Sequence, residues 1–126
     1  MTKPYWITDE QIKSKKHTIV NGRIERFDVN ISDNGTSTEL AICIHMNDAY
    51  GNPLTDVPLT KTLGPVILAL AELLGACEPG ERGYLSDFEK LPCRVIRHHT
   101  TMEVIGIGHF LYDRFVIFED MINALK

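Results

Sequence analysis

Histidine, tyrosine, aspartate and arginine gather in one short stretch near the C-terminus, and these residue types could do chemistry. The stretch holds His109, Tyr112, Asp113 and Arg114, at the end of a segment with the pattern of a strand. Side chains at such junctions often bind ligands, because a rigid scaffold presents them. A histidine, an acid and an arginine could bind an anion or transfer protons. The alternative is structural: Asp113 caps the last helix or pairs with Arg114.

Two glycines precede this stretch, at positions 106 and 108 of the same expected strand. Because strand side chains alternate between faces, both glycines leave the same face bare. We expect the chain itself to fill that space, through Phe118 or Met121, with an external partner or ligand as the alternative. The candidate ligand- or partner-binding residues are therefore Gly106, Gly108, His109, Tyr112, Asp113 and Arg114.

Metal binding and nucleophilic catalysis have weaker support, although the chain has five histidines and three cysteines. None of the spacings typical of zinc sites is present, neither Cys-x-x-Cys, nor His-x-x-x-His, nor His-Glu-x-x-His. We therefore expect no metal, no cofactor and no stoichiometric zinc. No catalytic residue is assigned, and an enzyme is the less favoured interpretation. A four-ligand zinc site could still be assembled from side chains among Cys43, His45, Cys93, His98, His99 and His109.

Composition limits the class of protein. A chain of 126 residues with 44% hydrophobic and 24% charged residues is typical of one globular domain, which we place at 1–126. The net charge of −4, without a basic patch, argues against binding in a nucleic-acid groove. No apolar run approaches the roughly 20 residues of a membrane helix, and the polar start lacks the pattern of a secretory signal. We expect a cytoplasmic protein without a disulfide framework.

The elements that must position these residues follow from periodicity. Phe27, Val29 and Ile31 alternate with polar residues. The turn Ser32-Asp33-Asn34-Gly35 follows, and then a second alternating strand that ends at Met46. A second hairpin is expected from Cys93–Arg97, a turn near His98-His99-Thr100, and Met102–Phe110. The segment 47–61 reads as a connecting loop.

Three helices are expected around these hairpins. The longest covers about 63–74, where apolar residues recur at helical spacing, with Pro65 in the first turn and Gly75 as the stop. Leu70, which lies on this helix, should be fully buried between the helix and the sheet. A short helix begins after Thr8, which has capping-box spacing with Gln11. The tail, Phe115–Leu125, could open as a strand and should close as a helix.

The order of elements predicts an α+β fold: two antiparallel β-hairpins in a four-stranded sheet, with the long helix on one face and short terminal helices.

Residues from Leu91 onward resemble small phage- and prophage-encoded proteins of unknown function. The resemblance rests on Leu91-Pro-Cys-Arg-Val95, on Ile105-Gly-Ile-Gly-His-Phe-Leu111 and on Asp113-Arg-Phe115. In those proteins a strand with Pro-x-Arg-Val precedes a hairpin ending in Gly-His-x-x-x-Asp. The resemblance implies a phage origin and marks His109 and Asp113.

Three functions are consistent with these observations. The favoured one is a non-catalytic, phage-type binding protein that acts on a host or defence protein in the host cytoplasm. The second is a small-ligand or nucleotide binder that uses Gly106, Gly108, His109 and Arg114. The third is a small histidine-dependent hydrolase or metal enzyme.

Overall fold

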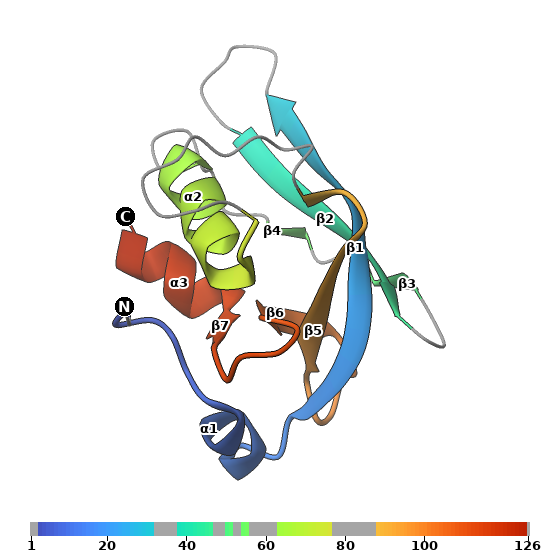
Figure 1. The fold of residues 1–126 in the computed structure, drawn as a ribbon, viewed down its shortest axis with the longest axis vertical. Coiled ribbons are helices and arrows are strands. Elements are labelled where there is room, and N and C mark those ends of the chain that lie inside the picture. The colour runs from blue at the N-terminus through green and yellow to red at the C-terminus, as the bar shows by residue number, and fades with distance from the viewer. Residues whose placement is uncertain are drawn as a thin grey trace.

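The structure is a computed structural model that describes residues 3–31, 38–46, 50–51, 54–55, 63–76 and 88–125. Figure 1 shows one twisted antiparallel sheet with helices packed against it. The strands are β1 (Thr18–Ile31), β2 (Thr38–Met46), β3 (Tyr50–Gly51), β4 (Leu54–Thr55), β5 (Leu91–Arg97), β6 (Val104–Gly108) and β7 (Phe115–Ile117). The helices are α1 (Asp9–Ser14), α2 (Leu63–Leu74) and α3 (Phe118–Leu125).

The α+β class is confirmed, but the expected four-stranded sheet is wrong. The strand order is β3-β2-β1-β5-β6-β7, and β4 also pairs with β2. The two hairpins, β1-β2 and β5-β6, join because β1 pairs with β5 as well as with β2. Strand β7 then adds to β6. The segment expected as a plain loop at 47–61 contributes β3 and β4 to the edge of β2, and the rest of it lies outside the described residues.

Strand β1 is long because it serves two partners. Its N-terminal half pairs with β5, from Thr18 opposite Arg97 to Ile24 opposite Leu91. Its pairing with β2 shifts register between Ile24 and Arg26, which is a β-bulge. The bulge explains why the apolar alternation of the sequence breaks near Ile24, whose side chain is fully buried. The turn expected at 32–35 lies outside the described residues.

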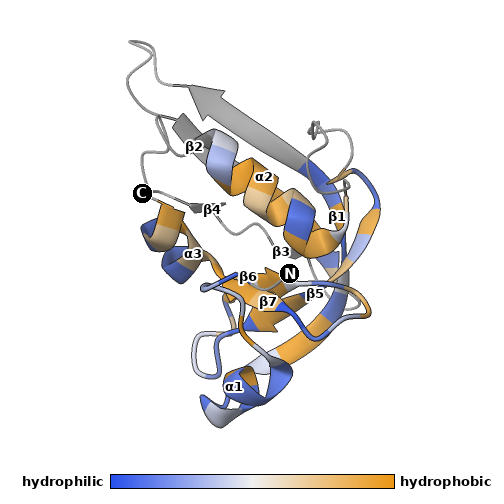
Figure 2. Cartoon of the chain, turned by 60° about the vertical axis from the view of Figure 1, so that its left-hand side comes forward, coloured by the Kyte–Doolittle hydropathy of each residue, from blue (hydrophilic) through white to orange (hydrophobic). Residues whose placement is uncertain are grey.

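Apolar side chains cover both faces of the sheet. The larger cluster joins α2 and α3 to one face, and its members include Ile44, Leu70, Val95, Val116 and Met121. The smaller cluster lies on the opposite face and consists of Ile12, Ile96 and Phe115. Neighbouring residues such as Phe115 and Val116 therefore belong to different clusters, as the two-residue period of a strand requires. Figure 2 shows the apolar character of α2 and of strands β5, β6 and β7.

Helix α2 spans the range that its apolar spacing predicts. Leu70 is fully buried, as expected, while Leu68 on the other side of the helix is 43% exposed. The helix ends at Gly75, whose φ of 73° suits glycine, and Ala76 N–H donates to the carbonyl of Ala71 at 2.9 Å. This is the Schellman arrangement of a helix C-terminus.

The terminal helices also follow local signals. Thr8 and Gln11 form the predicted capping box of α1, in which each side chain accepts from the other residue's backbone N–H. The tail forms both a strand and a helix, β7 followed by α3, and α3 buries Phe118, Met121 and Ile122. None of the helices in the described part of the chain is long and apolar enough to cross a lipid bilayer.

Candidate functional site

Four of the six predicted site residues lie in the loop 109–114, which connects β6 to β7 and is closed by its own backbone. His109 N–H donates to the carbonyl of Arg114 at 3.0 Å, and Arg114 N–H donates to the carbonyl of Tyr112 at 2.8 Å. Arg94 of β5 reinforces the loop: its Nε donates to the carbonyl of His109 at 2.9 Å, and its Nη2 to that of Tyr112 at 2.7 Å. The loop is therefore tightly bonded to the sheet.

His109 organises the loop from inside. Its Nδ1 accepts from the backbone N–H of Leu111 at 2.9 Å and from that of Tyr112 at 3.0 Å. Its ring stacks on Tyr112, with centroids 4.4 Å apart. Burial lowers the pKa of His109, and the charges of Arg114 and Arg94 lower it further. A neutral imidazole is also what the two bonds require, because only an unprotonated Nδ1 can accept.

Asp113 ties the loop to the first helix. Its Oδ1 accepts from the backbone N–H of Asp9, the first residue of α1, at 2.6 Å. A carboxylate at a helix N-terminus satisfies an orphan N–H and complements the helix dipole. Asp113 therefore caps a helix, as the structural alternative predicted, but that helix is α1 and not the last one.

Arg114 ties the same loop to the end of α2. Its Nε donates to the carbonyl of Leu73 at 2.7 Å, and its Nη2 to that of Glu72 at 3.2 Å. The guanidinium also lies over the rings of Trp6 and Tyr112, 5.1 and 5.2 Å from their centroids. Arg114 thus neutralises the partial negative charge at the helix C-terminus, which is a structural role.

The space beside the two strand glycines is filled by the chain itself. A Cβ at Gly108 would overlap the ring of Phe115, and one at Gly106 would overlap the carbonyl oxygen of Val116 and the side chain of Ile96. Filling from within is what we expected, but the residues responsible are on β7 and β5, not Phe118 or Met121. Neither glycine presents an open groove to a ligand.

The tip of the loop is apolar and exposed. Phe110 is 44% exposed, Leu111 73% and Tyr112 61%. Among these three residues, which we call the loop tip, the sequence-based site includes only Tyr112. Three consecutive large apolar side chains at the end of an expected hairpin strand were the signal that could have identified Phe110 and Leu111.

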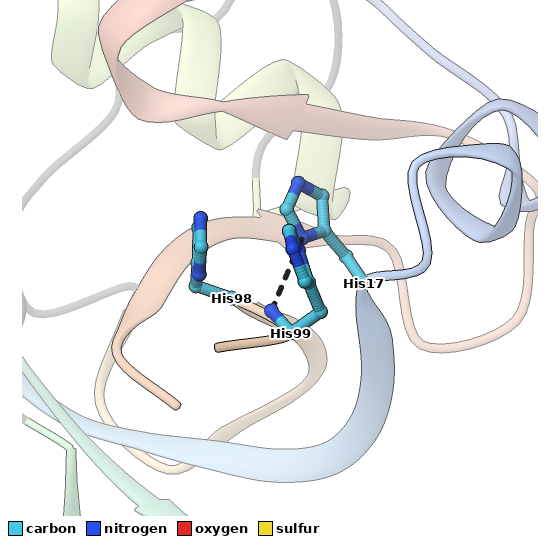
Figure 3. Close-up of side chains that lie close together, drawn as sticks. All are labelled: His17, His98 and His99. Carbon is cyan, nitrogen blue, oxygen red and sulfur yellow. Dashed lines mark hydrogen bonds between the residues drawn. The ribbon is translucent and has the colours of Figure 1, made fainter. Parts of the chain in front are cut away.

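Three histidines meet at the opposite end of β6. Sequence reasoning considered His98 and His99 as metal ligands but missed His17, because it did not pair β1 with β5. His17 precedes β1, while His98 and His99 follow β5, and one ring nitrogen of each lies within 4.8 Å of the others. Figure 3 shows the three rings converging from two segments. Partial burial lowers the pKa of His17, and the charges of His98, His99 and Lys15 add to this effect. We call these residues the histidine cluster.

Among the residues whose side chains the structure describes, the other groups considered as ligands or nucleophiles are not part of this cluster. Cys93 lies in the larger core cluster, and burial raises the pKa of its thiol to about 12. A thiol with such a pKa stays protonated at neutral pH and is a poor nucleophile or metal ligand. His109 lies in the β6–β7 loop. The side chain of Cys43 is outside the described residues.

A small polar pocket opens beside strands β1 and β2. It has a volume of about 310 Å³ and is lined by Asn21, Gly22, Arg23, His45 and Met46. Arg23 Nη2 lies 2.9 Å from Glu25 Oε1 and 3.4 Å from His45 Nδ1. The hydrogen bond from Arg23 lowers the pKa of Glu25. Glu25 neutralises the charge of Arg23, which lines the pocket. The pocket is therefore a weak site for an anion.

Comparison with protein-family models, with curated proteins and with solved structures finds no match to this chain. The side chains described above are therefore the basis for assigning a function. Two features of the described residues are candidates for function: the exposed loop tip and the histidine cluster.

Proposed function

We propose that this chain is a non-catalytic binding protein that inserts its loop tip, Phe110, Leu111 and Tyr112, into an apolar pocket on another protein. The observation that carries the proposal is the exposure of three consecutive large apolar side chains, with Leu111 at 73%. Single exposed apolar residues are ordinary on protein surfaces, whereas adjoining ones mark interaction sites.

The rigidity of the loop supports this function. The loop is bonded to β5 by Arg94 and to its own backbone by His109. It is bonded to α1 by Asp113 and to α2 by Arg114. A loop held in one conformation loses little entropy on binding, so more of the contact energy contributes to affinity. Tyrosine is among the residues that most often dominate binding energy at interfaces. Three of the site residues that we predicted, His109, Asp113 and Arg114, thus act as supports for the loop tip.

The proposed partner is a folded protein with an apolar pocket. Following the resemblance to phage-encoded proteins, we place that partner in the host, as a host or defence protein of the cytoplasm. A net charge of −4 disfavours nucleic acid as the partner.

The two alternative functions receive less support. A ligand at Gly106 and Gly108 would compete with Phe115 and Val116 for space that they already occupy. Arg114 donates to helix carbonyls, and His109 uses Nδ1 to hold the loop. A hydrolase that used His109 as a base would have to give up those bonds.

The test is capture from a host lysate by the immobilised protein and by variants of equal fold stability. Tyr112→Ser and Leu111→Ser should lose the partner that the wild type captures. Met102→Ser is the matched control, because Met102 is 48% exposed but lies in the turn at the other end of β6. With the isolated partner, Tyr112→Ser should raise Kd roughly thirtyfold, the effect of a hot spot worth about 2 kcal/mol.

Two outcomes would contradict the proposal. One is a captured partner that binds the Tyr112→Ser, Leu111→Ser and Met102→Ser variants equally. The other is a dimer of this chain, seen by sedimentation velocity, that Leu111→Ser dissociates. In that case the loop tip would be an interface between copies and not a site for a host protein.

A further inference from the structure

The sheet brings three histidines to one end of the β1–β5 ladder. Thr18 pairs with Arg97, so the residues just beyond this pair, His17 on one side and His98 and His99 on the other, leave the ladder together. Their ring centroids lie 4.5 to 5.0 Å apart. Figure 3 shows that the connection before β1 and the turn after β5 supply the rings. Hydrogen-bonded strands therefore fix the backbones that carry these side chains.

The spacing of the nitrogens fits a metal ion. Nδ1 of His17 and Nδ1 of His99 are 3.2 Å apart. Two nitrogen ligands at about 2.0–2.1 Å from a tetrahedral zinc ion lie about 3.3 Å apart. Across all three histidines, one ring nitrogen of each lies within 4.8 Å of the others, a gap that rotation of partly exposed side chains can close. We propose that His17, His98 and His99 form a binding site for one divalent transition-metal ion of the zinc class, which reverses the expectation of no metal drawn from the spacing of histidines and cysteines along the sequence.

The donor set defines which ions the site takes. Three imidazoles suit Zn²⁺, Co²⁺, Ni²⁺ and Cu²⁺, whereas Mg²⁺ and Ca²⁺ require oxygen ligands. His99 is exposed, so water has access to a fourth ligand position. This site lies at the other end of β6 from the loop tip and does not depend on the proposed binding function.

Metal binding requires a change in the hydrogen bonds of His98. Its Nδ1 accepts from the backbone N–H of Thr100 at 3.1 Å and from that of Thr101 at 3.3 Å, which leaves Nε2 for the metal. A neutral imidazole that binds metal through Nε2 carries its proton on Nδ1, where it can no longer accept. Loading therefore releases the N–H groups of Thr100 and Thr101, and the turn after β5 rearranges.

The experiment is a titration of the metal-free protein with ZnCl2, followed by calorimetry, and with CoCl2, followed by visible absorption. We expect one equivalent of either ion and the absorption bands of Co²⁺ with nitrogen ligands. His17→Gln and His99→Gln should each weaken binding at least about tenfold, since even the loss of an outer contact has an effect of this size. His45→Gln is the matched control, because His45 lies on β2 away from the cluster, and its affinity should be unchanged.

Further measurements separate loss of the site from loss of the fold. The Leu111→Ser variant should bind zinc like the wild type, and MgCl2 should give no binding. Thermal unfolding without metal shows whether the His17→Gln and His99→Gln proteins remain folded. In amide exchange, zinc should speed exchange at Thr100 and Thr101. The proposal fails if the wild type binds no zinc, if the His17→Gln and His99→Gln variants bind like the His45→Gln control, or if half an equivalent binds with dimer formation.

Discussion

At the scale of single residues, three of the predicted site residues bond to backbone groups. His109, Asp113 and Arg114 each contact backbone groups of a different segment: the loop itself, α1 and α2. These polar side chains therefore provide hydrogen-bond partners for backbone groups that would otherwise lack them, at helix ends and in a tight loop.

His109 should make stability depend on pH. Its folded-state pKa lies below the unfolded value of about 6.5, so the unfolded chain binds the proton more tightly. The stability that neutral His109 confers is full above the unfolded pKa and is lost as pH falls through the folded pKa. His109→Asn keeps an acceptor near the position of Nδ1 but does not titrate. Urea unfolding between pH 8 and pH 5 should show a steeper loss for the wild type; parallel profiles would contradict this role.

Gly108 should tolerate no side chain. Its missing Cβ makes room for the ring of Phe115, so Gly108→Ala should destabilise the fold by about 1–3 kcal/mol, the usual range for overpacking. Gly64 provides the control, because a Cβ there meets nothing within 4 Å and alanine favours the helix. Gly64→Ala should leave stability equal or higher. A Gly108→Ala protein as stable as the wild type in urea would mean that Phe115 can move aside.

At the scale of elements, the β6–β7 loop terminates helix α2 together with the helix's own residues. Gly75 and Ala76 complete the Schellman turn, and Arg114 donates to the carbonyls of Leu73 and Glu72. A Cβ at Gly75 would lie 3.3 Å from His109 Nε2, so the loop packs directly on the helix end. The loop and the helix therefore stabilise each other.

Arg114→Met should weaken this contact by about 1.5–3 kcal/mol, the range for hydrogen bonds to a charged group. Arg114→Lys should recover only part of the loss, because an ammonium group lacks the planar fork of guanidinium. The control is Arg23→Met, where an exposed ion pair with Glu25 is broken and the change should stay within about 0.5 kcal/mol. Urea midpoints provide the measurement. Equal effects at the two arginines would exclude the capping role.

At the scale of the whole molecule, the sheet is covered on both faces. Helices α2 and α3 cover one face, and α1 with Ile12 covers part of the other. The loop 109–114 lies where these layers meet, since it contacts both α1 and α2.

Leu70 tests the packing of α2 on the sheet. The side chain is fully buried, so Leu70→Ala should reduce the free energy of unfolding by about 2–5 kcal/mol. Leu68→Ala on the same helix is the control: Leu68 is 43% exposed, and its loss should be much smaller. Both are measured from urea denaturation. If the two substitutions had the same small effect, the helix-on-sheet core would be wrong.

The sequence by itself determined the three helices, the capping box of α1 and the stop of α2. The helix at 63–74, the box of Thr8 and Gln11, and the closing helix were predictable because each depends on residues within a few positions of one another. The candidate stretch from Gly106 to Arg114 was also identified, since strand glycines and clustered polar residues are unusual wherever they occur.

Only the tertiary structure decided what those residues contact. No local pattern states that β1 pairs with β5, yet that pairing joins the two hairpins and places His17 beside His98 and His99. Arg114 reaches the carbonyl of Leu73, 41 positions away, and Asp113 reaches the N–H of Asp9, 104 positions away. Such contacts depend on how whole layers pack, because burial and strand register act on all elements at once while propensity acts on each element alone.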